Sequence, residues 1–172
     1  MSGGVRRGEL RRGSRVLRWI EAGSGAPSVV LETGAESPAT TWAPILGPLA
    51  DRFRVVVYDR AGYGLSDPAA ELTLDPQIGD LEALAAEIGG ACVVVGHSWG
   101  GLPGRGECAG RHRRFAAPIA AGRRAPVVPR DRAADRNVAR GTAADAGHYV
   151  HFGRPHLVLQ AIDDVIAESR RP

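Results

Sequence analysis

A serine stands at the centre of the run GHSWGG at residues 96–101, with a glycine two positions to either side. The preceding run ACVVV, residues 91–95, is typical of a strand buried on both faces. A nucleophile on a sharp turn from strand to helix has a strained backbone, and Gly96 and Gly100 let the chain fold back without collision. The hydroxyl then stands at the carboxyl edge of the sheet, where α/β folds place their sites. We therefore predict that Ser98 is a catalytic nucleophile; the alternative is a plain tight turn.

The elements that must position Ser98 follow one another in the order strand, helix, strand. Residues 53–58 (FRVVVY) contain a continuous β-branched run, which predicts a second buried strand. Residues 75–88 keep their apolar side chains at helical spacing, with Asp75 as the expected N-cap and a glycine pair as the stop. Because two buried strands flank one helix, we expect a parallel βαβ unit with a right-handed crossover.

Further elements are expected nearer the N-terminus. Residues 15–22 (RVLRWIEA) and 28–32 (SVVLE) are short β-rich runs separated by glycines and a proline, which indicates a hairpin. Residues 41–50 predict a short helix, with Thr40 or Thr41 as its N-cap and a proline in its first turn.

Residues 15–101 resemble the N-terminal half of an α/β-hydrolase of the esterase, epoxide hydrolase and haloperoxidase-like type. The run at residues 96–101 resembles the family's nucleophile elbow, and we call it the elbow. Beside it, the resemblance rests on three stretches: LETGA at 31–35, YDRAGYGLSD at 58–67 and GHYVH at 147–151. They stand where this family has its His-Gly oxyanion turn, its D-x-R-G-x-G-x-S loop and the segment that delivers its catalytic histidine. An apolar stripe at helical spacing over residues 157–166 then predicts an amphipathic C-terminal helix.

The resemblance implies an α/β fold with an incomplete α/β-hydrolase-like sheet, mostly parallel, with an N-terminal hairpin and helices on both faces. It places residues 1–172 in a single domain without a cap domain. Residues 15–101 are its N-terminal half, 102–141 an irregular segment rich in Arg, Gly, Pro and Ala, and 142–172 the part with the catalytic histidine and the last helix. A length of 172 residues agrees with one domain.

The resemblance also implies a role for each site residue. Ser98 would be the nucleophile and His148 the general base, which takes the hydroxyl proton and later returns it to the leaving group. The backbone amides of Ala35 and Trp99 would form the oxyanion hole. Thr33 replaces the family's usual histidine, a change of small consequence because the donor there is a backbone amide.

Other residues of these motifs have two interpretations each. His151 is a rival base, and we interpret it as a structural or wall residue because no glycine precedes it. Arg60 and Ser66 are expected to tie their loop together rather than to touch substrate. For Trp42 and Trp99 the two interpretations are a place in the core or pocket wall and a contact with substrate, and the sequence favours neither.

The acid of the triad is the least well marked member. It should follow a strand and precede the histidine, so that it holds the imidazole in the right tautomer. Asp131, after the short proline-flanked run 125–129, is the best candidate, ahead of Asp135 and Asp145. Without an acid, turnover should fall on the order of 10⁴-fold.

Residues 102–141 depart from the family pattern. From 101 to 141 the chain holds ten Arg against three acids, with six Gly and four Pro, and neither helical nor strand periodicity persists. Only 50 residues separate Ser98 from His148, so about 80–100 residues of a usual one-domain fold are missing. We hypothesise a deletion, with or without an out-of-frame stretch, between residues 101 and 140. Reading the encoding DNA in its other two frames tests the out-of-frame part.

The amino-acid composition limits the classes of protein to which this chain can belong. Apolar residues make up 44% and charged residues 24%, which is typical of a globular chain. The net charge of +3 does not indicate a nucleic-acid site, because such sites pair arginine with aromatics and Phe115 is the only aromatic of the Arg-rich segment.

No apolar run reaches the ~20 residues that cross a bilayer and no signal peptide is recognised, so we expect a cytoplasmic protein without membrane contact. Cys92 and Cys108 lack metal-ligand spacing, so we expect a buried thiol at Cys92 and neither metal nor cofactor.

The sequence favours a serine hydrolase of a small-molecule ester or related acyl substrate, because haloalkane and epoxide relatives generally use aspartate at the nucleophile position. A perhydrolase-like reaction fits the same residues. The alternative from another class is a catalytically impaired or inactive remnant that at most binds a ligand or partner. A third is a basic nucleic-acid binder through residues 105–140, which would bind with a steep salt dependence. The oligomeric state is open, since an incomplete sheet leaves an unpaired edge.

Overall fold

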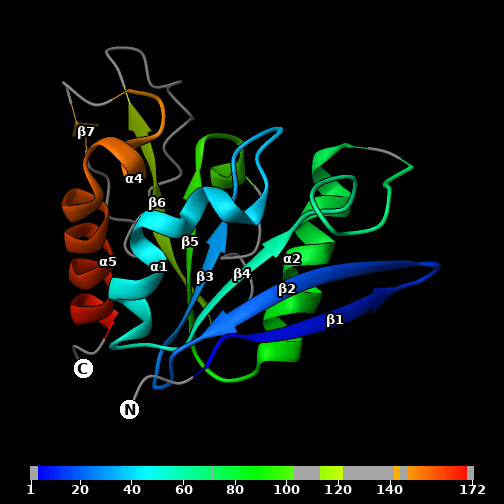
Figure 1. Cartoon of the computed structure of the whole chain (residues 1–172), viewed down its shortest axis with the longest axis horizontal. Coiled ribbons are helices and arrows are strands. Elements are labelled where there is room, and N and C mark those ends of the chain that lie inside the picture. The colour runs from blue at the N-terminus through cyan, green and yellow to red at the C-terminus, as the bar shows by residue number, and fades with distance from the viewer. Residues whose placement is uncertain (1–3, 71, 103–112, 122–141, 144–146, 170–172) are drawn as a thin grey trace.

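One mixed sheet organises the chain (Figure 1). The computed structural model describes residues 4–70, 72–102, 113–121, 142–143 and 147–169. Within them the spatial order of the strands is β1-β2-β4-β3-β5-β6-β7. Their bounds are β1 (Arg6–Arg12), β2 (Arg15–Ala22), β3 (Ser28–Glu32), β4 (Val55–Asp59), β5 (Cys92–His97), β6 (Arg113–Ala121) and β7 (Thr142–Ala143). β1, β2 and β4 pair antiparallel, whereas β4, β3, β5, β6 and β7 pair parallel, which confirms the mostly parallel α/β sheet.

Helices cover both faces of the sheet, as predicted (Figure 1). Helices α1 (Ala43–Ala50) and α5 (Pro155–Ser169) pack on one face and α2 (Leu74–Ile88) on the other. Short elements complete the fold: α4 (Val150–Gly153) and the 3-10 turns η1 (Ala39–Trp42) and η2 (Ser98–Gly100). Alternate residues of β5 face opposite sides, so Val93 and Val95 pack with α1 and α5, whereas Cys92 and Val94 pack with α2. This alternation decides which side chains share a face near the elbow.

The predicted hairpin between residues 15–22 and 28–32 is wrong. Both runs are strands, but β4 lies between β2 and β3 in the sheet. All five residues of β3 are buried, which is typical of a central strand covered on both faces, and β3 pairs parallel with β4 and β5. The N-terminal hairpin is formed instead by β1 and β2, around Gly13 with φ +62. The two strands of the expected βαβ unit, β4 and β5, run parallel with β3 between them.

The helix starts also differ from the predicted caps. α1 begins after Trp42 without a side-chain cap, and the Thr41 hydroxyl donates instead to the Pro38 carbonyl oxygen at 2.9 Å. α2 begins one residue before Asp75, which lies in its first turn rather than at the cap. The predicted glycine stop is confirmed, because Gly89 follows α2 with φ +69.

Residues 113–121 correct the prediction that 102–141 is irregular throughout. They form β6, which pairs parallel with β5. Pro118 lies in this strand and has no N–H for the ladder, and the pairing register shifts there, between Val95 and His97 of β5. Residues 103–112 and 122–141 lie outside the described residues. None of the described helices has the length and apolar character required to span a membrane.

Candidate active site

The turn after β5 is strained in the way that the sequence predicts. Ser98 has φ +52, a conformation that residues with a side chain rarely adopt. A Cβ on Gly96 would lie 2.6 Å from the Gly100 carbonyl oxygen, and a Cβ on Gly100 would lie 2.3 Å from the Thr33 carbonyl oxygen. Both contacts are too short for any larger residue. The fold-back of the chain therefore requires Gly96, and the close approach of the end of β3 requires Gly100.

The loop after β3 lies directly against this turn. A Cβ on Gly34 would be 3.4 Å from the Ser98 Cβ and 2.9 Å from His97 Nδ1. Ala35 follows in an exposed position, and the Trp99 side chain is 37% exposed. The structure thus brings both proposed oxyanion segments beside Ser98.

A hydrogen bond between His97 and the His148 backbone holds the His148 segment beside the elbow. His97 is buried, and its Nε2 donates a hydrogen bond to the His148 carbonyl oxygen at 2.8 Å. The two imidazole centroids are 4.9 Å apart, and His148 itself is exposed. Burial lowers the pKa of His97 and outweighs the hydrogen bond to the His148 carbonyl oxygen, which raises it. A neutral His97 with its proton on Nε2 therefore anchors the segment that presents His148.

His151 has the surroundings of a wall residue, as we interpret it from the sequence. Its side chain is 1% exposed and packs against Trp42, with ring centroids 4.5 Å apart. Burial, followed by the neighbouring histidines His97 and His148, lowers its pKa to about 4. Trp42 is 1% exposed and belongs to the core.

The opposite face of the sheet holds a buried polar group that sequence reasoning missed. Glu32 ends β3 and is fully buried on the α2 side, because its neighbour Leu31 packs with α1 and α5. Its Oε1 lies 3.4 Å from Arg60 Nη1, and neither carboxylate oxygen has a hydrogen bond of good geometry among the described residues. The His97 ring lies near Trp42 on the other face, and neither Glu32 oxygen has a hydrogen bond to His148 among the described residues.

Gln77 is the second residue that sequence reasoning missed. Its Oε1 accepts hydrogen bonds from Arg60 Nη1 at 3.2 Å and from the Trp99 indole at 2.9 Å. A signal was present, because Gln77 precedes Leu81 by four residues and so falls on the buried stripe of α2. A polar residue on an apolar stripe marks a buried hydrogen-bonding position.

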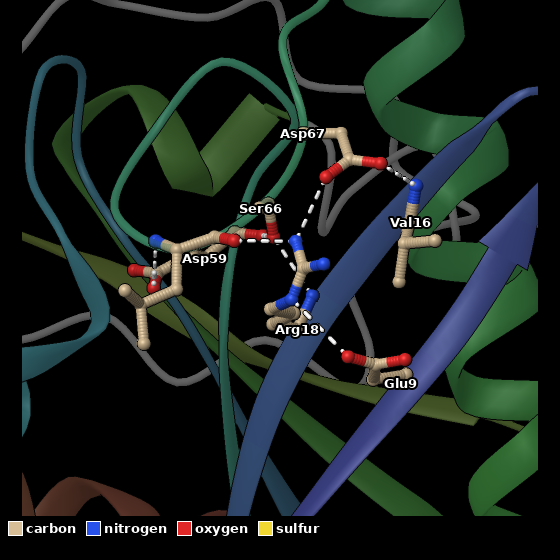
Figure 2. Close-up of polar contacts among 7 residues, drawn as sticks. Glu9, Val16, Arg18, Asp59, Ser66 and Asp67 are labelled. Carbon is tan, nitrogen blue, oxygen red and sulfur yellow. Dashed lines mark hydrogen bonds and ion pairs between the residues drawn. The ribbon is translucent and has the colours of Figure 1, made fainter.

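The motif loop at residues 58–67 is fixed to β2 by polar contacts (Figure 2). Ser66 Oγ accepts a hydrogen bond from the Arg18 amide at 2.8 Å and donates to the Asp59 carbonyl oxygen. Asp67 accepts from the Arg18 guanidinium at 2.8 Å. The Asp59 carboxylate accepts from the Ala39 amide at 2.7 Å, which joins the loop to η1. These contacts support the interpretation that Ser66 ties its loop together.

A family model described as the alpha/beta hydrolase family matches residues 23–161. This range includes the elbow, the loop after β3 and the His148 segment. The chain belongs to the alpha/beta hydrolase family.

This chain is similar to several known proteins over part of their length. The uncharacterized protein YqjL of Bacillus subtilis is 35% identical over 94 residues, which are 52% of this chain and 37% of that protein. The cis-3-alkyl-4-alkyloxetan-2-one decarboxylase of Xanthomonas campestris is 30% identical over 115 residues, 60% of this chain and 38% of that one. An epoxide hydrolase structure from Vigna radiata covers 75% of this chain and 41% of its own at a TM-score of 0.63 and 23% identity, which shows the shared fold. The α/β-hydrolase thus spans less than two fifths of the length of these two relatives.

Asp131 and its alternatives Asp135 and Asp145 lie outside the described residues, as does Cys108. Cys92 is buried at 2% exposure, as predicted. Among the residues that the structure describes, no three His, Cys, Asp or Glu side chains are grouped to hold a metal ion.

The buried Glu32 carboxyl predicts a pH dependence of stability in this α/β-hydrolase. Desolvation raises its pKa from 4.5 to about 7, against the attraction of Arg60. Between these pH values the folded state holds a proton that the unfolded state has released, so the free energy of unfolding falls as pH rises through this window. The shift corresponds to about 3 kcal/mol. The free energy of unfolding of Glu32→Gln, taken relative to that of wild type, should therefore increase by about 3 kcal/mol between pH 4.5 and pH 8.

Denaturant unfolding of both proteins across this pH range measures the difference. The comparison with wild type removes the contribution of other titrating groups such as His151. The pKa of His151 is about 4 in the folded state and 6.5 in the unfolded state, so this group makes the free energy of unfolding rise with pH between these values. Glu21→Gln is the matched control, because Glu21 is equally buried but hydrogen bonds from Arg54 and Arg6 outweigh desolvation and lower its pKa. Its stabilisation is present above the unfolded pKa and lost as pH falls, the opposite sign. A Glu32→Gln difference that stays constant with pH contradicts the raised pKa.

Proposed function

We propose that this α/β-hydrolase is a serine hydrolase of ester or related acyl substrates. The observation that carries the proposal is the convergence of three segments at the positive-φ turn. Ser98 sits on that turn, the loop after β3 lies against it, and the His148 segment is hydrogen-bonded to the residue before it. We assign Ser98 as nucleophile, His148 as general base and the backbone amides of Ala35 and Trp99 as the oxyanion hole.

In the proposed reaction, His148 takes the Ser98 hydroxyl proton as Oγ attacks the substrate carbonyl carbon. The negative charge that develops on the carbonyl oxygen is stabilised by the Ala35 and Trp99 amides. Collapse of the tetrahedral intermediate expels the alcohol, which receives the proton from His148, and leaves the acyl group on Ser98. Water then attacks the acyl-enzyme by the same route and releases the acid. Asp131 is the proposed acid that holds His148 in the productive tautomer.

Exposed aromatic side chains support a substrate with an apolar acyl group. Trp99 follows the nucleophile and is 37% exposed, and Tyr149 follows the base and is 43% exposed. Phe152 is 54% exposed, with its ring 6.1 Å from that of Tyr149. Rings of this kind bind apolar groups well. A serine at the elbow, rather than an aspartate, favours acyl transfer over epoxide opening.

The test is acylation by p-nitrophenyl acetate and butyrate, with styrene oxide as the comparison substrate. We expect a burst of p-nitrophenol, an acyl adduct on the peptide that contains Ser98 and no diol from the epoxide. Circular dichroism establishes that the sample is folded. Diol formation without an acyl adduct contradicts the ester assignment.

A remnant that only binds a ligand or partner is the second candidate function. Two observations favour it: no hydrogen bond between described residues joins the Ser98 hydroxyl to His148, and the chain spans 37–38% of two relatives. This candidate predicts a folded protein that forms neither acyl adduct nor diol. The acylation experiment therefore separates the two candidates.

A further inference from the structure

A buried polar path links the two segments that carry the proposed oxyanion donors. Arg60 follows β4 and is 2% exposed. Its Nη2 donates to the Gly34 carbonyl oxygen, and its Nη1 donates to Gln77 Oε1 at 3.2 Å. The same Gln77 oxygen accepts from the Trp99 indole Nε1–H at 2.9 Å. One side-chain path therefore runs from the 34–35 peptide to Trp99.

The Gly34 carbonyl matters because it shares a peptide unit with the Ala35 amide. In a trans peptide the C=O and the following N–H point in opposite directions. A guanidinium that holds the Gly34 oxygen therefore fixes the direction of the Ala35 N–H, away from Arg60. A charge-assisted hydrogen bond to the carbonyl also polarises the peptide and strengthens its N–H as a donor.

Both side chains of the path are held by further contacts. Arg60 Nη1 lies 3.4 Å from Glu32 Oε1, and the guanidinium lies 5.1 Å from the centre of the Tyr63 ring. Gln77 Nε2 donates to the Leu72 carbonyl oxygen at 3.1 Å. Fixed geometry of this kind is what an oxyanion hole requires, because donors that are already oriented cost no reorganisation during the reaction.

We propose that Arg60 and Gln77 form a clamp that positions both oxyanion donors, the Ala35 amide through its peptide and the Trp99 amide through its indole. This inference rests on the proposed function. The clamp does not touch substrate; it acts through the two amides when charge develops on the carbonyl oxygen. Losing it should lower kcat more than it changes KM, because the ground-state substrate carries no such charge.

The first test compares Gln77→Leu with Gln77→Glu. Both variants lose the donation to Leu72, but only glutamate keeps an oxygen that accepts from Trp99 and Arg60. We expect Gln77→Leu to lower kcat for p-nitrophenyl butyrate, and the rate constant of fluorophosphonate reaction at Ser98, by about 10- to 100-fold, less than the loss of a whole donor. KM should change little, and Gln77→Glu should recover most of the rate.

The second test is Arg60→Lys, because lysine keeps the charge but not the fork that reaches two oxygens at once. Arg54→Lys is its matched control. Arg54 also holds a backbone carbonyl, that of Ile88 at 2.8 Å, and a buried carboxylate, that of Glu21 at 2.6 Å. Both substitutions remove the same kind of contact, and we expect the loss of kcat only in Arg60→Lys.

The Trp99 indole N–H signal, assigned in NMR spectra with Trp99→Phe, gives a readout that does not depend on turnover. It should shift and exchange faster in Gln77→Leu, because its acceptor is gone. If the signal changes while Ser98 reacts at the wild-type rate, the clamp is wrong and the proposed function stands. If Gln77→Glu loses as much rate as Gln77→Leu, the clamp is also wrong. If folded wild type does not react at Ser98, the proposed function fails and the clamp fails with it.

Discussion

Replacing Ser98 by alanine is expected to lower the rate of ester hydrolysis by at least about 10³-fold and to abolish the acyl adduct. Alanine removes the attacking Oγ, and no bond can then form to the substrate carbonyl carbon. The rate that remains comes from the oxyanion hole and substrate binding. The control is Ser14→Ala, because Ser14 lies exposed in the β1–β2 turn. Steady-state hydrolysis of p-nitrophenyl butyrate measures both variants.

His148→Ala should cost nearly as much, because without the base the hydroxyl keeps its proton during the attack. The double variant of Ser98 and His148 should be no slower than the worse single variant, since residues that act as a unit are non-additive. His156→Ala, on an exposed histidine of α5, is the control. Losses that multiply in the double variant, or a wild-type rate in either single variant, contradict the assigned pair.

Gly100→Ala is expected to have the largest effect on the elbow itself. The added Cβ would lie 2.3 Å from the Thr33 carbonyl oxygen and 2.6 Å from the Glu32 carbonyl oxygen, and both are backbone atoms. Relief requires the end of β3 to move away from the turn, at a cost of at least about 2 kcal/mol in unfolding free energy. A displacement of Ser98 by about 1 Å lowers the rate on the order of 10²-fold. Denaturant unfolding and ester hydrolysis measure the two effects.

Gly47→Ala is the matched control for this substitution. Gly47 lies exposed on α1, and a Cβ there meets no atom within 4 Å beyond its chain neighbours and the backbone of its own helix. Alanine favours the helix over glycine by up to about 1 kcal/mol, but Pro48 follows and crowds a Cβ on the preceding residue. We therefore expect this variant to stay close to wild type in stability and rate. If Gly100→Ala matches Gly47→Ala in both stability and rate, the close approach of β3 to the elbow is wrong.

The strands were predictable where their signal is local. Residues 53–58 and 91–95 each contain three consecutive valines, which favour a strand covered on both faces, and both match observed strands, β4 and β5. Pairing depends on distant segments, and adjacency in the sequence led to a β2–β3 hairpin that β4 in fact separates. β1 has the sequence RRGELRR and a single large apolar residue, so its backbone ladder with β2 had no side-chain signal.

The same distinction applies to the site. The turn at Ser98 was predictable because the steric demand on Gly96 comes from the nearby backbone of Gly100 and Gly101, whereas the demand on Gly100 comes from the distant end of β3. Glu32 and Gln77 were missed because each is one polar residue within an apolar pattern, and its partner Arg60 comes from another segment of the chain. β6 was missed because its alanines and proline carry no strand period. The role of Asp131 stays a prediction.

The most direct test of the central claim, that Ser98 is the nucleophile, is reaction of the folded protein with a fluorophosphonate, followed by peptide mass spectrometry to map the modified residue. We predict one adduct, on Ser98, that is absent in Ser98→Ala and strongly reduced in His148→Ala. A folded protein that forms no adduct, or that carries it on another serine such as Ser66, would contradict the claim.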